Sequence, residues 1–257
     1  MRKSIASNVK TYVVVLLVLC LGICSCKKPS NNSEPNNSDQ PAPGNSKGND
    51  TSTNQDDPGL VPLEIKLPKP HFEGTPSNIE VDNLQPAREG PRPLVYVPVG
   101  TTNVALGKPV TSTSMDPLVI GKLEQITDGD KEATDGSYVE LDPFKQSITI
   151  DLQAEYEIYA IVFWHYHQQA RVYFDVIVQV SNDPDFITGV ETLFNNDVDN
   201  TSGMGTGSDM RYVDTSEGKL VEAKGVRARY VRLYSSGNNS DDMNNYIEVE
   251  VYGKPAK

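Results

Sequence analysis

Short stretches of alternating apolar and polar residues dominate the second half of the chain. The clearest run from Ser147 to Leu152, from Tyr173 to Ser181 and from Ile247 to Tyr252. A period of two residues is typical of β-strands with one buried face. Clusters of Asn, Asp, Ser and Gly separate these stretches, and no long segment shows the 3.6-residue period of a helix. The pattern therefore predicts an all-β sandwich or barrel.

The beginning of the chain has a different pattern, which indicates export. Basic residues precede an apolar run of twelve residues, 12–23, which is short for a bilayer span but typical of a signal peptide. The run ends in Ile-Cys-Ser-Cys, which resembles a bacterial lipobox, so we expect a lipoprotein signal peptide over 1–25 and lipidation of Cys26. An ordinary signal peptide cut near Ser25 is the alternative.

The residue after Cys26 refines the expected location. It is Lys27, whereas Gram-negative lipoproteins retained at the inner membrane usually have Asp there. The resemblance therefore implies a protein of the cell envelope that is held at the outer membrane, on its periplasmic or its surface face. Contact with the membrane is expected through the lipid anchor only.

Two segments separate the signal from the β-rich part. Residues 26–58 are rich in Ser, Asn, Asp, Gly and Pro and nearly devoid of aliphatic side chains, so we expect a disordered tether. Residues 59–100 mix recurring prolines with Leu, Ile and Val, which excludes helices and predicts an extended arm, with a short strand over 63–67. The arm either docks on the domain that follows or forms a second loose linker.

Charge and cysteine usage exclude several classes. The chain carries 23 basic and 35 acidic residues, a net charge of -12, which argues against nucleic acid as a partner. All three cysteines lie within the first 26 residues. A disulfide framework or a cysteine-based zinc site in the β-rich part is therefore excluded.

Several sequence motifs occur in the order expected for one known family. They are Asn103–Val110 (NVALGKPV), Ile126–Asp130 (ITDGD), Ile148–Leu152 (ITIDL), Ala228–Leu233 (ARYVRL) and Ile247–Gly253 (IEVEVYG). Residues 101–254 thereby resemble a discoidin, or coagulation factor V/VIII type C, domain. This galactose-binding-like family includes the family 32 carbohydrate-binding modules and fucose-binding lectins. The resemblance implies a jelly-roll β-sandwich.

The resemblance also implies a calcium site. Asp128-Gly129-Asp130 supplies carboxylate and backbone oxygens in a tight turn, which suits a hard cation. Carried over from the family, the ligands would be the Asp128 side chain, the backbone carbonyls of Gln125 and Asp130, and the carboxylate of Glu248 in the last strand. The calcium would be structural. The alternative is an ordinary Asp-Gly turn with solvated acids.

In sugar-binding members of the family the ligand site lies in loops at one end of the barrel. The matching loops here are about 115–124, 165–171 and 237–245. From them we select His165, His167, Arg171 and Asn244, because Arg, His and amide groups can bind hydroxyl or carboxylate groups. The alternative is that the histidines complete a strand in the core and the Asn forms a turn.

Motifs for catalysis are missing from the sequence. It contains no nucleophile elbow, no H-E-x-x-H and no P-loop. We therefore expect a non-catalytic carbohydrate-binding module on a lipid-anchored envelope protein, with a glycan or polysaccharide as its partner. Two alternatives stay open: an adhesion or scaffold module that binds another envelope protein, and an accessory subunit of a secreted glycoside hydrolase.

Overall fold

The computed structural model describes residues 59–72, 74–76 and 78–257. All of these lie in the second of two units into which the chain divides, residues 53–257. The predicted signal peptide, lipidated Cys26 and tether lie outside the described residues. Among the residues that are described, no helix is long and apolar enough to cross a membrane.

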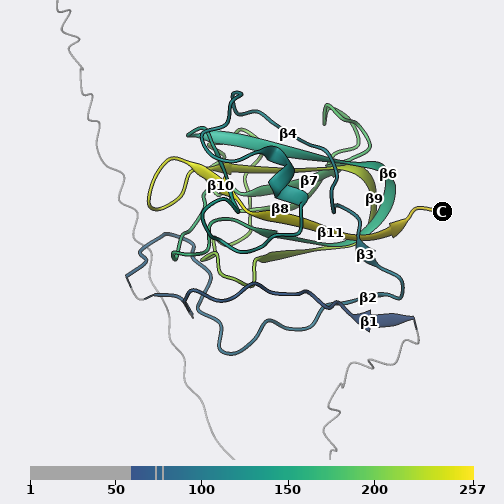
Figure 1. Ribbon diagram of the computed structural model, residues 1–257, viewed down its shortest axis with the longest axis horizontal. Helices are drawn as coiled ribbons and strands as arrows, with labels where there is room; N and C mark the ends of the chain where they lie inside the picture. The colour runs from purple at the N-terminus through teal and green to yellow at the C-terminus, as the bar shows by residue number, and fades with distance from the viewer. Residues whose placement is uncertain (1–58, 73, 77) are drawn as a thin grey trace, which may run out of the picture. The chain divides into compact units, whose positions relative to one another are not determined.

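Nearly all regular structure is antiparallel β-sheet, as the alternation predicts (Figure 1). The main sheet has seven strands, and six of them follow the order β3-β11-β6-β9-β7-β8. Their bounds are β3 Thr102–Asn103, β6 Lys145–Trp164, β7 Ile177–Ser181, β8 Glu191–Asn195, β9 Lys219–Ser236 and β11 Glu248–Pro255. The seventh, β4 (Val110–Ser112), pairs with β6.

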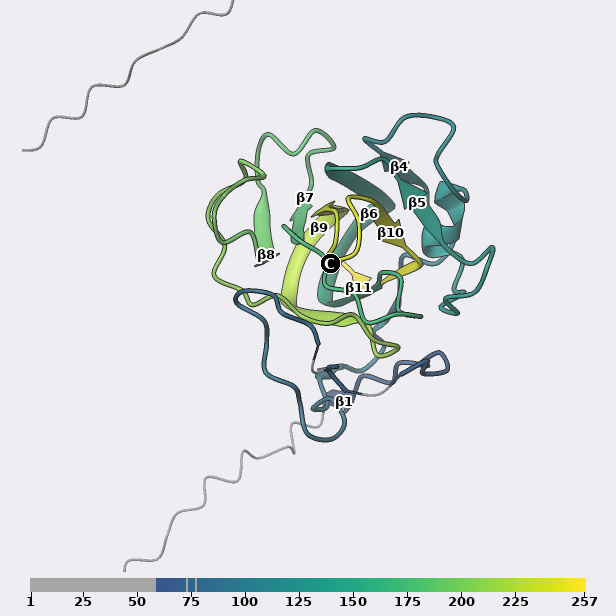
Figure 2. The same cartoon turned by 90° about the vertical axis from the view of Figure 1, so that its left-hand side faces the viewer.

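Two long strands join the two layers of the sandwich. The first part of β6 pairs with β4, and its second part, from Tyr156 onward, pairs with β11. Strand β9 follows β6 along its length, with register shifts between Asp151 and Tyr156 and between Ile158 and Ala160. Bulges bend a strand pair and increase its twist. Figures 1 and 2 show the two strands curving together. The expected jelly-roll β-sandwich is confirmed.

The hydrophobic core follows the alternation in the sequence. Ile148, Ile150 and Leu152 are fully buried, whereas Thr149 and Asp151 between them are partly exposed. They join one cluster with Phe163 and Val249 from the other layer. Burial of each such side chain stabilises the fold by about 1.5–3 kcal/mol.

Two expectations about strands are wrong in their bounds. The predicted strand from Tyr173 to Ser181 begins only at Ile177, because Asp175 has a positive φ of 49° that interrupts the extended backbone. In the arm, the predicted strand over 63–67 is absent, and the strand there is β1 (Leu60–Pro62), paired with β2 (Tyr96–Pro98).

The arm lies along the domain, which favours the docked alternative. Leu63 and Ile65 pack against a second cluster of buried residues around Trp164. Nη1 of Arg92 donates to the carbonyl oxygens of Glu217 at 3.0 Å and Gly218 at 3.2 Å. These contacts hold the Pro-rich segment in an extended conformation. Proline lacks the backbone N–H that a helix needs, but it fits an extended backbone.

A two-stranded ribbon at one end of the sandwich completes the fold. Strand β5 (Val139–Leu141) pairs antiparallel with β10 (Asn244–Tyr246), so that Glu140 stands opposite Asn245. A short 3-10 helix, η1 (Leu123–Thr127), precedes β5 in the chain. The ribbon therefore brings side chains 105 residues apart in the sequence to the same place.

Candidate ligand-binding site

The pairing of β5 with β10 creates the first contact of the site. Nδ2 of Asn245 donates to Oε2 of Glu140 at 2.9 Å. Asn245 is 1% exposed, whereas Glu140 is only partly buried. The buried amide of Asn245 therefore restrains the carboxylate of Glu140, which remains partly exposed.

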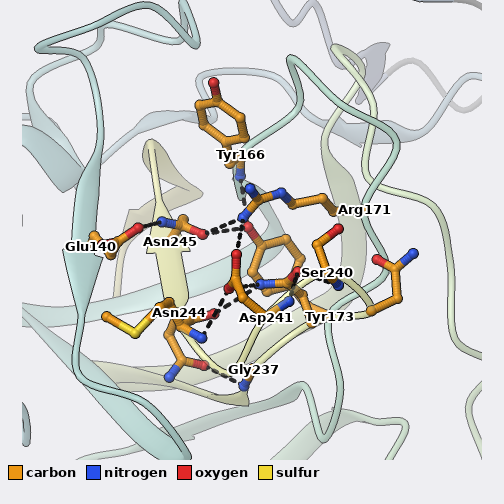
Figure 3. Close-up of polar contacts among 12 residues, drawn as sticks. Glu140, Tyr166, Arg171, Tyr173, Gly237, Ser240, Asp241, Asn244 and Asn245 are labelled. Carbon is orange, nitrogen blue, oxygen red and sulfur yellow. Dashed lines mark hydrogen bonds and ion pairs between the residues drawn. The ribbon is translucent and has the colours of Figure 1, made fainter.

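Arg171 extends this arrangement from a different loop. Its Nη1 donates to Oδ1 of Asn245 at 3.0 Å and lies 3.4 Å from Oδ2 of Asp241 (Figure 3). Its Nε is buried and has no hydrogen-bond partner among the described residues. Glu140, Asn245 and Arg171 thus form a linked series of acceptor, amide and donor, which we call the Arg171 relay.

Two tyrosines flank the Arg171 relay. The guanidinium carbon of Arg171 lies 5.0 Å from the ring centroid of Tyr166, within the range of a cation–π contact. Tyr138 meets Tyr166 edge to face, with 5.1 Å between the ring centroids. Both rings are partly exposed. Burial, with Glu140 next in importance, raises the pKa of Tyr138, so its hydroxyl stays protonated and can donate.

Tyr173 connects the Arg171 relay to the hydrophobic core. The hydroxyl of this buried residue donates to Oδ1 of Asn245 at 2.9 Å, so the oxygen accepts from both Tyr173 and Arg171. The Tyr173 ring stacks on His165, with 4.1 Å between centroids and 17° between planes. Both χ angles of Tyr173 are therefore restrained by packing, which fixes the position of Asn245.

His165 itself lies in the core and not in the site. Its side chain is 0% exposed and contacts the rings of Phe163, Tyr173 and Tyr246. Burial lowers its pKa from 6.5 to about 3, so the ring is neutral. A ligand at the surface cannot reach this side chain, which corrects its selection as a binding residue.

His167 and Asn244 are also structural. His167 is 0% exposed, and its Nε2 lies 2.9 Å from the carbonyl oxygen of Lys131. Asn244 is 0% exposed; its Nδ2 donates to the carbonyls of Asp142 at 2.8 Å and Phe144 at 2.7 Å, and its Oδ1 accepts from Gly237 N–H at 2.9 Å. Of the four residues selected from the loops, only Arg171 is placed where a ligand could touch it.

Sequence reasoning alone does not single out Glu140 or Asn245. Acidic and amide residues are frequent in this chain, and neither residue belongs to a motif. Two signals were available: Asn245 lies in the candidate loop 237–245, and both residues lie in short stretches next to apolar residues, VEL and NNY, as strand residues do. Only the pairing of β5 with β10 shows that they meet.

The predicted calcium loop contains a buried carboxylate that lacks a full set of partners. Glu248 is 0% exposed; Oε2 accepts from Gly129 N–H at 3.1 Å, while Oε1 has no hydrogen-bond partner in the described part of the chain. Burial, with the charges of Glu250 and Asp128, raises the pKa of Glu248 to about 9. A hard cation beside Glu248 and Asp128 would compensate both charges, so these two residues fit the group.

The side chains of the other two predicted ligand residues, Gln125 and Asp130, are engaged within the loop. The carboxylate of Asp130 accepts from Glu132 N–H at 2.9 Å and from the Ser137 hydroxyl at 2.8 Å. Oε1 of Gln125 accepts from Lys122 N–H at 2.6 Å, and its Nε2 donates to the Gly136 carbonyl oxygen. Only the backbone carbonyls of Gln125 and Asp130 could then serve a cation, as the resemblance implies.

The neighbouring Glu250 has a cation of its own. Nζ of Lys131 lies 2.6 Å from Oε1 of Glu250 and 5.1 Å from the Trp164 ring centroid. This buried pair neutralises Glu250, which stands two residues beyond Glu248 on the same strand. Glu250 is therefore not needed as a cation ligand.

A second acidic group lies elsewhere, where Asp175, just before β7, meets the loop after β8. One carboxylate oxygen from each of Asp175, Asp197 and Asp199 lies within 4.8 Å of the others. Thr201 Oγ1 donates to Asp175 at 3.0 Å, and the backbone N–H groups of Thr201 and Ser202 donate to Asp197 at 3.1 and 3.0 Å. The loop thus satisfies these carboxylates itself, and we assign them no ligand.

Comparisons with known proteins found similarity among solved structures. No family model matches the chain, and no curated protein sequence matches it. The chain is similar to the CBM32 of AlyQ in complex with 4,5-unsaturated mannuronic acid, at 22% identity over 56% of this chain and 92% of that one, with a TM-score of 0.41. It is similar to the fucose binding module SpX-3 of Streptococcus pneumoniae, at 17% identity over 59% and 97%, with a TM-score of 0.42.

A larger protein is also among the similar structures. This is a family 89 glycoside hydrolase from Clostridium perfringens, at 21% identity and a TM-score of 0.43; the match covers 60% of this chain but 15% of that one. The chain thus spans a small part of the hydrolase. The two modules are of the kind that the sequence resemblance named.

Proposed function

We propose that the domain binds carbohydrate through the Arg171 relay and has no catalytic role. The observation that carries this proposal is the hydrogen-bonded series Arg171–Asn245–Glu140 beside two partly exposed tyrosines. A sugar hydroxyl donates one hydrogen bond and accepts others. The guanidinium of Arg171 supplies donors, the carboxylate of Glu140 supplies acceptors, and the buried amide of Asn245 keeps both in place.

The tyrosines supply the apolar part of such a site. The C–H face of a sugar ring packs on aromatic rings, and Tyr166 and Tyr138 meet beside the guanidinium. A site of this kind combines an apolar surface with a few placed polar groups. The polar groups alone would also suit a free carboxylate, so the tyrosines favour a saccharide over a simple acid.

Two further parts of the proposal concern the setting of the domain. A structural calcium held by Asp128 and Glu248 would link the loop after η1 to β11; the unpartnered Oε1 of Glu248 supports this. Lipidation of Cys26 would tether the domain to the cell envelope, supported by the lipobox-like sequence alone. When bound, the calcium supplies positive charge to two carboxylates and takes no part in chemistry.

A glycan array probed with the full chain tests the proposal. We expect binding to a defined set of glycans that falls at least tenfold in the Arg171→Ala variant, a loss of about 1.4 kcal/mol or more. The matched control is Arg227→Ala, because Arg227 is 52% exposed and pairs with Glu157 on the strands away from the relay. Equal binding by both variants would overturn the site, and an array without binding would favour the protein-adhesion alternative.

A further inference from the structure

His165 and Asp214 form a buried pair of ionisable side chains next to the Arg171 relay. Their side chains are 0% and 1% exposed, and Nδ1 of His165 lies 4.0 Å from Oδ2 of Asp214. Neither ring nitrogen of His165 and neither carboxylate oxygen of Asp214 has a hydrogen-bond partner in the described part of the chain. Buried polar atoms in folded proteins are almost always paired. Four unpaired atoms on two neighbouring side chains therefore indicate a role beyond packing.

Three buried phenols lie around the pair. The rings of Tyr173 and Tyr246 contact His165, with 4.1 and 4.7 Å between the ring centroids. Asp214 acts electrostatically on Tyr173 and on Tyr212, whose hydroxyl also lacks a hydrogen-bond partner among the described residues. Burial is the chief cause that raises the pKa of all three phenols. The phenols therefore stay neutral and supply no charge that could compensate a carboxylate.

Two cations lie near these phenols, and neither of them pairs with Asp214. Arg171 acts electrostatically on Tyr173, and Nζ of Lys219 lies 4.7 Å from the ring centroid of Tyr212. Arg171 instead lies 3.4 Å from another carboxylate, and both oxygens of Asp214 are without a hydrogen-bond partner among the residues that the structure describes. An ionised Asp214 would therefore be an uncompensated charge in the core.

The pair has two states that differ by one proton on Asp214. Burial raises the pKa of Asp214 from 3.8 to about 8 and lowers the pKa of His165 from 6.5 to about 3. Near neutral pH both side chains are therefore uncharged, and Asp214 carries the proton. An unpaired buried charge is strongly unfavourable, so the packing around Asp214 has to open when the proton is lost.

Asp214 is connected directly to Arg171. Its backbone N–H donates to the carbonyl oxygen of Arg171 at 2.9 Å. His165 provides a second connection, because the ring of Tyr173 stacks on it and the Tyr173 hydroxyl donates to Oδ1 of Asn245 at 2.9 Å (Figure 3). Movement of Asp214 on ionisation therefore displaces the backbone that carries the Arg171 side chain.

We propose that Asp214 is a positioning residue for Arg171, and that loss of its proton releases Arg171 and weakens ligand binding at the relay. The effect on binding rests on the function proposed for the Arg171 relay. The movement of Arg171 does not, because it needs no ligand. By linkage, a bound ligand in turn favours the proton on Asp214.

Trp164, the single tryptophan of the chain, reports on the segment that carries Asp214. It is buried, and its Nε1 donates to the carbonyl oxygen of Ser216 at 3.0 Å. Tryptophan fluorescence of the full chain, titrated up to about pH 9 so that exposed tyrosines stay protonated, should shift with a midpoint near pH 8. Asp214→Asn cannot ionise and should show no shift. Asp185→Asn, an exposed acid in the loop after β7, should retain it.

Amide hydrogen exchange tests the connection to Arg171 without a ligand. At about pH 9 the segment 170–174 should exchange several-fold faster in the parent than in Asp214→Asn, whereas near pH 6 the two should exchange equally. Comparison at one pH removes the intrinsic pH dependence of exchange. The core segment 148–152 of β6 is the internal control and should not differ between the two proteins. Asp214→Leu, which also cannot ionise, serves as a second variant if Asp214→Asn does not fold.

Isothermal titration measures the effect on binding. The probe is the neutral glycan with the strongest signal on the array, because its own charge does not change with pH. The protonated fraction of Asp214 falls about tenfold between about pH 7 and about pH 9, so the affinity of the parent should fall by up to about tenfold. The affinity of Asp214→Asn should change by less than about twofold over the same interval.

Each step has a result that would overturn the proposal. A parent without the fluorescence shift, or a shift that persists in Asp214→Asn, would show that Asp214 does not control the packing. Equal exchange of segment 170–174 in both proteins at high pH, or a parent affinity that does not change with pH, would show that Asp214 and Arg171 are not coupled. An array without binding, together with the shift and the faster exchange, would refute the function proposed for the relay and leave this coupling in place.

Discussion

Nη1 of Arg171 and Oδ1 of Asn245 lie 3.0 Å apart, although 74 residues separate them in the sequence. The same oxygen accepts from the Tyr173 hydroxyl at 2.9 Å. Asn245 is 1% exposed, so it acts on a ligand only through Arg171 and Glu140. The residue that organises the candidate site is therefore one that a ligand would not touch.

Replacement of Asn245 tests this indirect role. Asn245→Ala should weaken glycan binding about tenfold, because Arg171 and Glu140 lose their common partner. Tyr173→Phe removes only one donor and should weaken binding a few-fold, with Tyr230→Phe as the control on the partly exposed Tyr230. Affinity is measured by titration, and thermal melting shows whether each variant is folded. If folded Asn245→Ala binds the glycan with unchanged affinity, Asn245 does not position Arg171 and Glu140.

Asn244, the neighbour of Asn245, should affect stability instead of binding. Its amide makes three hydrogen bonds to backbone groups of two other loops while 0% exposed. Asn244→Ala should lower the free energy of unfolding by about 2–4 kcal/mol, because each buried group left without a partner costs about 1–3 kcal/mol. Asn182→Ala, at an exposed position, should change it by less than about 0.5 kcal/mol in the same urea titration.

The buried Asp214 should make stability depend on pH. Burial raises its pKa from 3.8 to about 8, and neither carboxylate oxygen has a hydrogen-bond partner among the described residues. The folded state therefore keeps a proton that the unfolded chain releases. The contribution of Asp214 to stability is full below about pH 4 and is lost as the pH rises toward about 8.

Asp214→Asn removes this titration while keeping a neutral side chain of the same shape. Near pH 4 the variant and the parent should be equally stable. At pH 8 the free energy of unfolding of the variant should exceed that of the parent by roughly several kcal/mol. His165, whose lowered pKa costs stability as the pH falls below 6.5, is present in both proteins. Urea unfolding at several pH values checks this, and a pH-independent difference would contradict it.

Calcium should stabilise the chain if Asp128 and Glu248 hold it. Calcium at one hundred times its Kd should add about 2.7 kcal/mol to the stability, and EDTA should reverse the gain. Glu248→Gln should abolish the response, because the amide carries no charge and offers one oxygen only. Asp185→Asn, an exposed acid away from the loop, should retain it. A melting temperature that calcium and EDTA do not move would refute the site.

The alternation of apolar residues was sufficient to predict the sheet core. A period of two places Ile148, Ile150 and Leu152 on one face of β6, and this face is the one that the core covers. The bounds were harder to predict. The start of β7 depends on the conformation of Asp175, which an alternation pattern does not contain.

For polar residues, the sequence pattern does not predict which side chains are buried and which are exposed. His165 and Arg171 stand six positions apart in the same stretch, and sequence reasoning treats them alike. In the fold, aromatic side chains from three strands or loops enclose His165, while Arg171 remains partly exposed beside Tyr166. Exposure of a polar side chain depends on which distant segments pack over it, and no local period encodes that.

The sequence by itself determined the all-β class, the likeness to discoidin-type modules, the apolar core positions and the loop that contains Asp128. The tertiary structure decided the site: Glu140 meets Asn245 only because β5 pairs with β10, and Arg92 reaches the carbonyls of Glu217 and Gly218 only because the arm docks on the domain. The physical reason is that hydrophobic burial follows local alternation, whereas hydrogen-bonded sites form where segments far apart in the chain are brought into contact.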